Sequence, residues 1–173
     1  MKYNIENAKK VAKALLGAGA PITSLPFLMA QVAHETGDFD SNVYRNNTNM
    51  SGITYINKPA KQKNASRGTA LPQSEWSAPD KPIYYAKFNT LEDWARDYLR
   101  LVGSPVQKAK SIEEYAKLLK DRGYYTATLK SYTNAVKGHL AELMKQGLTN
   151  PPLDDTGLMY LSVALIVLLF ITL

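Results

Sequence analysis

One glutamate of this 173-residue chain stands where a carboxyl group could act as an acid. Glu35 falls in the last turn of an apolar segment, LPFLMAQVAHETG, which has the character of a helix ending at Gly37. A carboxylate there faces the negative end of the helix dipole and lies beside Leu28 and Val32. Both effects disfavour the charged form, so we expect a raised pKa, as general acid catalysis requires. A solvated glutamate at a helix end is the alternative interpretation.

The composition excludes several other chemistries. The chain has no cysteine, which removes disulfides, thiolate zinc sites and cysteine nucleophiles. Its two histidines, His34 and His139, are too few for a histidine-rich metal centre, and we expect no metal and no organic cofactor. The net charge of +6 favours an anionic partner such as a cell-wall polymer, a lipid surface or nucleic acid. Because no nucleic-acid-binding motif accompanies the charge, we do not expect nucleic acid as a partner.

Five segments have the apolar period and the end signals of helices, and these helices must position Glu35. Thr90 with Asp93, and Ser111 with Glu114, have the spacing of a capping box, which predicts that two of the helices begin there. The five expected helices cover residues 5–17, 24–37, 90–101, 111–119 and 131–146.

Residues 40–89 interrupt these helices with a stretch rich in Asn, Ser, Gly, Pro and Lys. Only YINK (55–58) and KPIYYAKF (81–88) resemble strands, and the prolines favour short edge pieces. Insertions of this length in compact domains are usually functional. We therefore expect a mainly α (α+β) fold, a helical domain with a small loop and β-hairpin lobe, called here the hairpin lobe (residues 40–89).

Four blocks of sequence, in this order, carry a resemblance to a known family. They read AHETGDF (33–39), NNTNMSGI (46–53), SEWSAPDKPIYYAKFNTLEDWARDYLRLV (74–102) and RGYYTATLKSYTNAV (122–136). In these blocks the chain resembles the glucosaminidase family of bacterial, flagellar and phage peptidoglycan hydrolases, which have a lysozyme-like helical fold. The chain departs from the family pattern at His34, which replaces a small residue, and in the last block, which lacks an Asp-Pro pair.

The resemblance implies catalytic roles for three residues. Glu35 matches the family's catalytic acid, and Glu75 matches a second acid in the lobe. Tyr124 matches the tyrosine of the family's GY motif, and it could orient the acetamido group or the attacking water. Each has an alternative interpretation, since Glu75 could be a solvated loop acid and Tyr124 a core aromatic.

Further residues are expected to bind the glycan. The resemblance implies that Asn47 and Gly52 belong to the block that lines the glycan cleft, and it leaves Tyr125 as an alternative to Tyr124. The aromatic residues of the lobe could stack on sugar rings. The candidate substrate-binding residues are Asn47, Gly52, Trp76, Tyr84 and Tyr125. Alternation in IYYAKF places Tyr84 and Tyr85 on opposite faces, so one of the two should serve packing.

These residues together predict a peptidoglycan hydrolase that cleaves β-1,4 glycosidic bonds. Such cleavage needs a protonated carboxyl at the leaving oxygen and negative charge near the oxocarbenium ion. The leading hypothesis is an endo-β-N-acetylglucosaminidase. A muramidase or lytic transglycosylase on the same fold, and a non-catalytic structural or wall-binding protein, are the alternatives. Because Glu75 lies on a loop, the sequence leaves retention or inversion of the anomeric carbon open.

The end of the chain has a different character from the rest. Residues 158–173 carry no charge, which favours a C-terminal transmembrane helix that binds a lipid membrane, although a helix buried in the globule is the alternative. Residues 147–157 (GLTNPPLDDTG) have the composition of a linker. We expect a domain over residues 1–146, this linker and the anchor. The setting most compatible with an anchored lytic enzyme is a phage virion with an internal membrane, or the host cell envelope.

Overall fold

The computed structural model of the chain describes residues 2–59 and 62–150. The described part is mostly helical, with one two-stranded sheet. In chain order its elements are α1 (Ile5–Gly17), the 3-10 turn η1 (Ile22–Ser24), α2 (Leu25–Thr36), α3 (Asn42–Asn47), β1 (Ser66–Ala70), the 3-10 turn η2 (Gln73–Glu75), β2 (Tyr84–Lys87), α4 (Leu91–Val102), α5 (Ser104–Gln107), α6 (Ile112–Asp121) and α7 (Leu129–Lys145).

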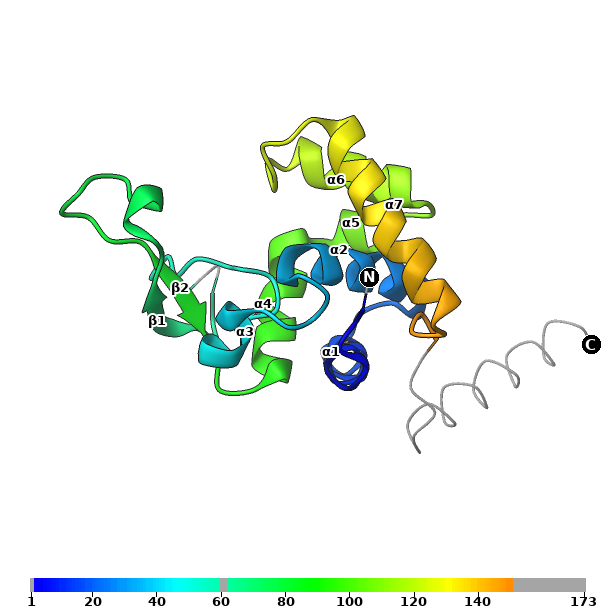
Figure 1. The fold of residues 1–173 in the computed structure, drawn as a ribbon, viewed down its shortest axis with the longest axis horizontal. Helices are drawn as coiled ribbons and strands as arrows, with labels where there is room; N and C mark the ends of the chain where they lie inside the picture. The colour runs from blue at the N-terminus through cyan, green and yellow to red at the C-terminus, as the bar shows by residue number, and fades with distance from the viewer. Residues whose placement is uncertain (1, 60–61, 151–173) are drawn as a thin grey trace, which may run out of the picture.

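Helix α2 runs through the middle of the molecule (Figure 1). It packs on α7 along one side, α1 packs on α4, and α6 packs on α7. The sheet and α3 lie together to one side of this helical body (Figure 1). The arrangement therefore presents the end of α2 beside α7, while the hairpin lobe reaches away from it.

The helices begin and end where the local sequence requires. The side chain of Thr90 accepts a hydrogen bond from the Asp93 backbone N–H at 3.1 Å, and Ser111 accepts one from Glu114 at 3.1 Å. These are the N-caps that the two capping-box spacings predict. Helix α2 ends at Gly37, whose φ of 57° is left-handed and stops the helix directly after Glu35 and Thr36.

A single cluster of buried apolar residues joins all the larger helices. Its largest fully buried members include Trp94, Tyr98, Tyr115, Phe39, Phe88 and Leu15. The expected helices 5–17, 24–37, 90–101 and 111–119 match α1, α2, α4 and α6 within one or two residues. The last helix, expected from 131, begins at Leu129 because Thr128 caps it.

The sheet differs from the prediction. Its strands pair antiparallel, with Ser66 opposite Lys87 and Ala70 opposite Tyr84. β2 lies within the expected KPIYYAKF segment, but YINK is not a strand, and the residue before it, Thr54, forms only an isolated bridge with Tyr85. β1 has the sequence SRGTA, which carries no apolar alternation, so long-range pairing rather than local pattern makes it a strand.

The fold class expected from the sequence was wrong in one part. The helical domain with its small two-stranded sheet fits a lysozyme-like α+β fold, but no helix of the described residues is long and apolar enough to span a bilayer. The segment expected to do so, residues 158–173, lies outside the described residues. A helix of that length would cover about 24 Å, less than the roughly 30 Å of a hydrocarbon core. An uncharged run alone was therefore weak grounds for a transmembrane helix.

Candidate active site

Glu35 lies in the last turn of α2, where this helix packs on α7. Its side chain is exposed to solvent, so a substrate could reach it. The surrounding protein nevertheless raises the pKa of the carboxyl by desolvation, and a hydrogen bond from Tyr132 partly offsets this. A carboxyl that is accessible yet biased toward its protonated form is the state that proton donation to a leaving group requires.

Tyr132 is a hydrogen-bond partner of Glu35 that was not among the site residues predicted from the sequence. It belongs to α7 and is only 4% exposed. Its hydroxyl donates to Glu35 Oε1 at 3.5 Å. Because the ring packs in the core and the hydroxyl reaches the carboxyl, Tyr132 both supports and polarises Glu35. Its place in the GY block, eight residues after Tyr124, was the one sequence signal for it.

Tyr124 and Tyr125 separate into two roles. Burial raises the pKa of Tyr124, and the negative charge of Glu35 raises it further, so this phenol lies in the electrostatic field of the acid. Tyr125 instead stacks on Tyr132, with centroids 3.7 Å apart and planes at 10°, and its hydroxyl donates to the Ala116 carbonyl at 2.9 Å. Tyr124 is therefore placed to act on Glu35, and Tyr125 to hold Tyr132.

His34 lies on the other side of Tyr132. Its ring meets the Tyr132 ring edge-on at 5.4 Å and lies 5.5 Å from the ring of His139. Burial lowers the pKa of both imidazoles. His139 in turn contacts the Tyr3 hydroxyl at 3.0 Å. This aromatic group packs the end of α2 against α7 and adds no opposite charge beside Glu35 at neutral pH.

The hairpin lobe places Glu75 in a different setting. Glu75 ends the 3-10 turn η2 and is exposed. Burial raises the pKa of Tyr85, and the charge of Glu75 adds to this effect, so Glu75 acts on Tyr85. The Trp76 indole donates to the Leu71 carbonyl at 2.9 Å, which closes the turn around η2. The carboxyl of Glu75 is thus exposed within the lobe, whereas that of Glu35 accepts a hydrogen bond from the buried Tyr132.

The aromatic residue Tyr84 is partly covered. The Arg67 guanidinium lies 4.9 Å from the centroid of the Tyr84 ring, in a cation–π contact across β1 and β2. One face of this ring is therefore occupied by Arg67. A sugar could stack only on the face that Arg67 leaves free.

Asn47 and Gly52 shape the backbone of the lobe. Asn47 is only 1% exposed, its Nδ2 donates to Thr69 Oγ1 at 2.8 Å, and its Oδ1 accepts from the Thr69 N–H at 2.9 Å. A Cβ added to Gly68 would lie 2.3 Å from Asn47 Oδ1, so the close approach of α3 to β1 requires glycine there. Gly52 has a φ of 61°. Asn47 thus joins α3 to β1, and its predicted contact with the glycan stays a prediction.

Unlike Glu35 and Glu75, Asp97 is a buried carboxylate, and both of its oxygens accept hydrogen bonds. It is 2% exposed and accepts from the backbone N–H groups of Lys63 and Asn64 at 3.2 and 3.1 Å, from the Asn64 side chain, and from Arg100. These hydrogen bonds tie the loop before β1 to α4. Asp97 therefore anchors the lobe.

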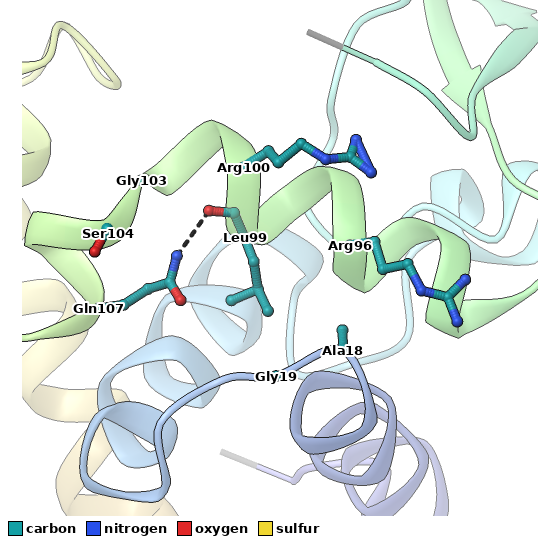
Figure 2. A pocket seen from close by; sticks show the side chains of 8 residues that line it. All are labelled: Ala18, Gly19, Arg96, Leu99, Arg100, Gly103, Ser104 and Gln107. Atoms are coloured by element: carbon teal, nitrogen blue, oxygen red, sulfur yellow. Dashed lines mark hydrogen bonds between the residues drawn. The ribbon is translucent and has the colours of Figure 1, made fainter. Parts of the chain in front are cut away.

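A hollow of about 490 Å³ lies on another part of the surface (Figure 2). α4, α5 and the turn after α1 line it, and Figure 2 shows Arg96 and Arg100 directing their guanidinium groups away from Gln107. It contains none of the residues predicted for the site. No group of three or more His, Cys, Asp or Glu side chains in residues 2–59 and 62–150 could hold a metal ion.

Comparison with protein families places this site in context. Residues 21–145 match the glucosaminidase family, described as mannosyl-glycoprotein endo-beta-N-acetylglucosaminidase. The chain belongs to this family. The match covers Glu35, Tyr124, Tyr132 and the entire hairpin lobe, and it confirms the resemblance predicted from the four sequence blocks. Family membership supports a glycoside hydrolase that acts on peptidoglycan.

One solved structure shares the fold. It is described as a type VI secretion system effector–immunity complex from Pseudomonas protegens, and the matched chain is 19% identical with a TM-score of 0.50. The match covers 78% of this glucosaminidase-family chain and 94% of the other. At this identity the likeness shows the fold alone. No curated protein matches the chain.

Proposed function

We propose that the chain is an endo-β-N-acetylglucosaminidase that cleaves the β-1,4 bond on the reducing side of N-acetylglucosamine in peptidoglycan, with Glu35 as general acid. One observation carries the proposal. Glu35 is an accessible carboxyl in the family's acid position, and desolvation raises its pKa. Such a group can hold a proton for the glycosidic oxygen at a pH where an ordinary glutamate has lost it.

In this proposal the two tyrosines next to Glu35 assist the acid. The Tyr132 hydroxyl donates to Oε1 at 3.5 Å, which stabilises the carboxylate after the proton has left. Tyr124, which responds to the charge of Glu35, orients the reacting sugar or the water that attacks it. Trp76 and the free face of Tyr84 contact sugars along the lobe.

Glu75 is proposed as the second carboxylate, which activates water or stabilises the oxocarbenium ion. It is exposed in η2, and its charge acts on Tyr85. For both carboxyls to act on one sugar, the glycan must bridge the lobe and the end of α2. A separation wide enough for a water molecule is typical of inverting enzymes, and a closer pair is typical of retaining enzymes.

The identity of the new reducing end tests this specificity. Purified peptidoglycan is digested with the full chain, reduced with borohydride and analysed by mass spectrometry. Reduced N-acetylglucosamine ends are expected. Reduced or anhydro muramic ends would contradict the glucosaminidase assignment while keeping a glycosidase on this fold, and no cleavage by the folded protein would indicate a non-catalytic wall-binding protein.

A muramidase or lytic transglycosylase is the second candidate. The observation that favours it is that Glu75 is exposed and its charge acts on Tyr85. Enzymes of this class often need only one glutamate, so they would not require Glu75 to act with Glu35. A Glu75→Gln variant with full activity, together with muramic reducing or anhydro ends, would establish this candidate.

Association with a phage virion is a separate proposal. Its support is that the family the chain belongs to includes phage enzymes, as the resemblance implies. Detection of the chain in purified particles by mass spectrometry tests it, and its absence from them would contradict it.

A further inference from the structure

A lysine in the last turn of α6 fastens the loop that leads from this helix into α7. Lys120 Nζ donates hydrogen bonds to three consecutive backbone carbonyls of the loop. They belong to Tyr125, Thr126 and Ala127, at 3.4, 3.0 and 2.7 Å. An ammonium group has three N–H donors, so the three carbonyls use all of them. Because carbonyl oxygens that converge on one point repel one another, the loop depends on the positive charge of Lys120 to keep this conformation.

The same ammonium lies over the Tyr125 ring, 5.2 Å from its centroid, in a cation–π contact. The Tyr125 ring in turn stacks on Tyr132, with centroids 3.7 Å apart and planes at 10°. At this separation the two rings lie face to face with little offset, an arrangement that aromatic pairs usually avoid because their negative faces repel. A cation beside one ring attracts its π electrons and offsets this repulsion. Lys120 thus favours the stack that fixes the Tyr132 ring.

The hydroxyl of Tyr132 is the group that bonds to Glu35. It donates to Glu35 Oε1 at 3.5 Å, which is the long limit of a hydrogen bond, so a small displacement of the ring is enough to break it. The ring is stacked on Tyr125 and meets the His34 ring edge-on. The support that Tyr125 gives to the ring therefore decides whether the hydroxyl reaches the carboxyl.

We propose that Lys120 is a positioning residue that holds Tyr125 against Tyr132 and so keeps the Tyr132 hydroxyl on Glu35. Each link of this chain is a contact in the structure: ammonium to loop carbonyls and ring, ring to ring, and hydroxyl to carboxyl. The hydroxyl stabilises the carboxylate that remains after Glu35 gives its proton to the leaving oxygen. The inference rests on the proposed function, because it concerns the acid of that reaction.

The other titratable groups around the acid are kept in a Lys120 variant. The phenols of Tyr115 and Tyr124 lie in the electrostatic field of Glu35, and the His34 imidazole precedes it on α2. A change in the titration of Glu35 therefore has two possible causes, the loss of the loop's support for the tyrosine stack or the loss of one positive charge. The two causes are separated by a background that lacks the hydroxyl and by a second lysine on the same helix.

Titration of the Glu35 carboxyl by ¹³C NMR on the full chain tests the proposal. Four proteins are compared: wild type, Lys120→Met, Tyr132→Phe and the double variant. Lys120→Met keeps a flexible side chain of similar length but removes the charge and its donors, so it should raise the Glu35 titration midpoint by about 0.5 pH unit. Tyr132→Phe should cause a similar rise. Lys120→Met should add nothing in the Tyr132→Phe background, because the hydroxyl that transmits its effect is gone.

Lys117→Met is the matched control. Lys117 lies three residues before Lys120 on α6, is exposed, and bonds to Asp121 at 2.6 Å. Its replacement removes the same charge from the same helix and leaves the loop carbonyls bonded, so the Glu35 midpoint should stay nearly unchanged. A rise with Lys120→Met that Lys117→Met reproduces, or that persists without the Tyr132 hydroxyl, would overturn the proposal. So would an unchanged midpoint in a folded Lys120→Met protein.

A second variant, Lys120→Gln, covers the case in which Lys120→Met does not fold. Its amide NH₂ can still donate to two of the carbonyls, but it brings no charge to the Tyr125 ring. The Glu35 midpoint should rise in the same direction by a smaller amount, and an unchanged midpoint would refute the proposal. None of these titrations needs glycan cleavage, so an inactive protein would count against the proposed function while the spectra still decide the role of Lys120.

Discussion

The two carboxylates expected to share the chemistry sit in opposite surroundings. Glu35 ends a central helix, receives a hydrogen bond from Tyr132, and has a raised pKa because the packed protein around it disfavours charge. Glu75 ends a short turn in the hairpin lobe and is exposed. The fold raises the pKa of the Glu35 carboxyl, whereas the Glu75 side chain is an exposed part of a short turn.

The two regions are also built differently. The helical body buries apolar side chains and a polar group centred on Gln31. The hairpin lobe has two short strands, and single polar side chains fasten it. Asn47 joins α3 to β1, and Asp97 joins the loop before β1 to α4. Under the proposed function, the body would prepare the acid in advance, while the lobe would supply contacts that the glycan completes.

The largest expected effect separates the two carboxylates by activity. Glu35→Gln should lower the rate of peptidoglycan cleavage by about 10³-fold or more, because the protonated donor is lost. Glu75→Gln should lower it by a smaller factor, about 10–100-fold, since its carboxyl only assists. Release of reducing ends by both variants, measured in parallel, gives the comparison. Equal losses would show that the lobe acid is prepared as fully as Glu35.

A second prediction concerns the pH dependence of activity in Tyr132→Phe. The Tyr132 hydrogen bond favours the ionised form of Glu35 and lowers its pKa. Removing the hydroxyl should therefore raise the pKa of Glu35 and move the alkaline limb of the rate profile to higher pH. The limb is measured with the full chain on soluble wall fragments. Tyr125→Phe, which lacks a bond to Glu35, is the control and should leave the limb in place.

The third prediction tests whether the lobe is independent of the acid. Asn47→Ala removes two hydrogen bonds to Thr69, so it should lower the free energy of unfolding by about 1–3 kcal/mol. The melting temperature should fall by about 2–4 °C for each kcal/mol. Asn46 is its exposed neighbour, and Asn46→Ala, the matched control, should leave the melting temperature nearly unchanged. A Glu35 pKa altered in Asn47→Ala would show that the regions are coupled.

The smallest expected effect is that of Glu35→Gln on the stability of the folded protein, which should increase at neutral pH. Because the folded protein raises the pKa of Glu35 above its ordinary 4.5, ionising this group opposes folding at neutral pH. Glu35→Gln should therefore raise the melting temperature at pH 7. Below pH 4.5 the carboxyl is protonated in both folded and unfolded chains, so the gain should vanish at pH 4. A gain that is equal at both pH values would contradict the cause given for the shift.

The sequence predicted the parts of the fold that local interactions determine. The capping residues Thr90 and Ser111, and the end of α2 at Gly37, each depend on neighbours three or four residues away. Glu35 could be selected for the same reason, because the dipole and apolar side chains of its own helix act on it. The membrane helix was inferred from composition, without such neighbours, and the structure did not bear it out.

The contacts that the sequence did not predict join residues far apart in the chain. The Tyr132 hydroxyl bonds to Glu35, which lies 97 positions earlier in the chain. The helical spacing of apolar residues around Tyr132 predicts only that its ring lies in the core. Asn47 of α3 bonds to Thr69, 22 positions later, and Thr69 belongs to β1, a strand whose sequence has no apolar alternation. The sequence alone allows several partners for each of these polar side chains. The packing of α2 on α7 selects the partner of Tyr132, and the packing of α3 on β1 selects that of Asn47.

The central claim is that the fold prepares Glu35 as the acid of a peptidoglycan glycosidase. Digestion of one peptidoglycan sample by wild type and by Glu35→Gln, with reduced ends quantified by mass spectrometry and folding checked by circular dichroism, tests it most directly. The account predicts new reduced N-acetylglucosamine ends with wild type and almost none with the folded variant. A folded Glu35→Gln protein that cleaves the glycan at the wild-type rate would contradict it.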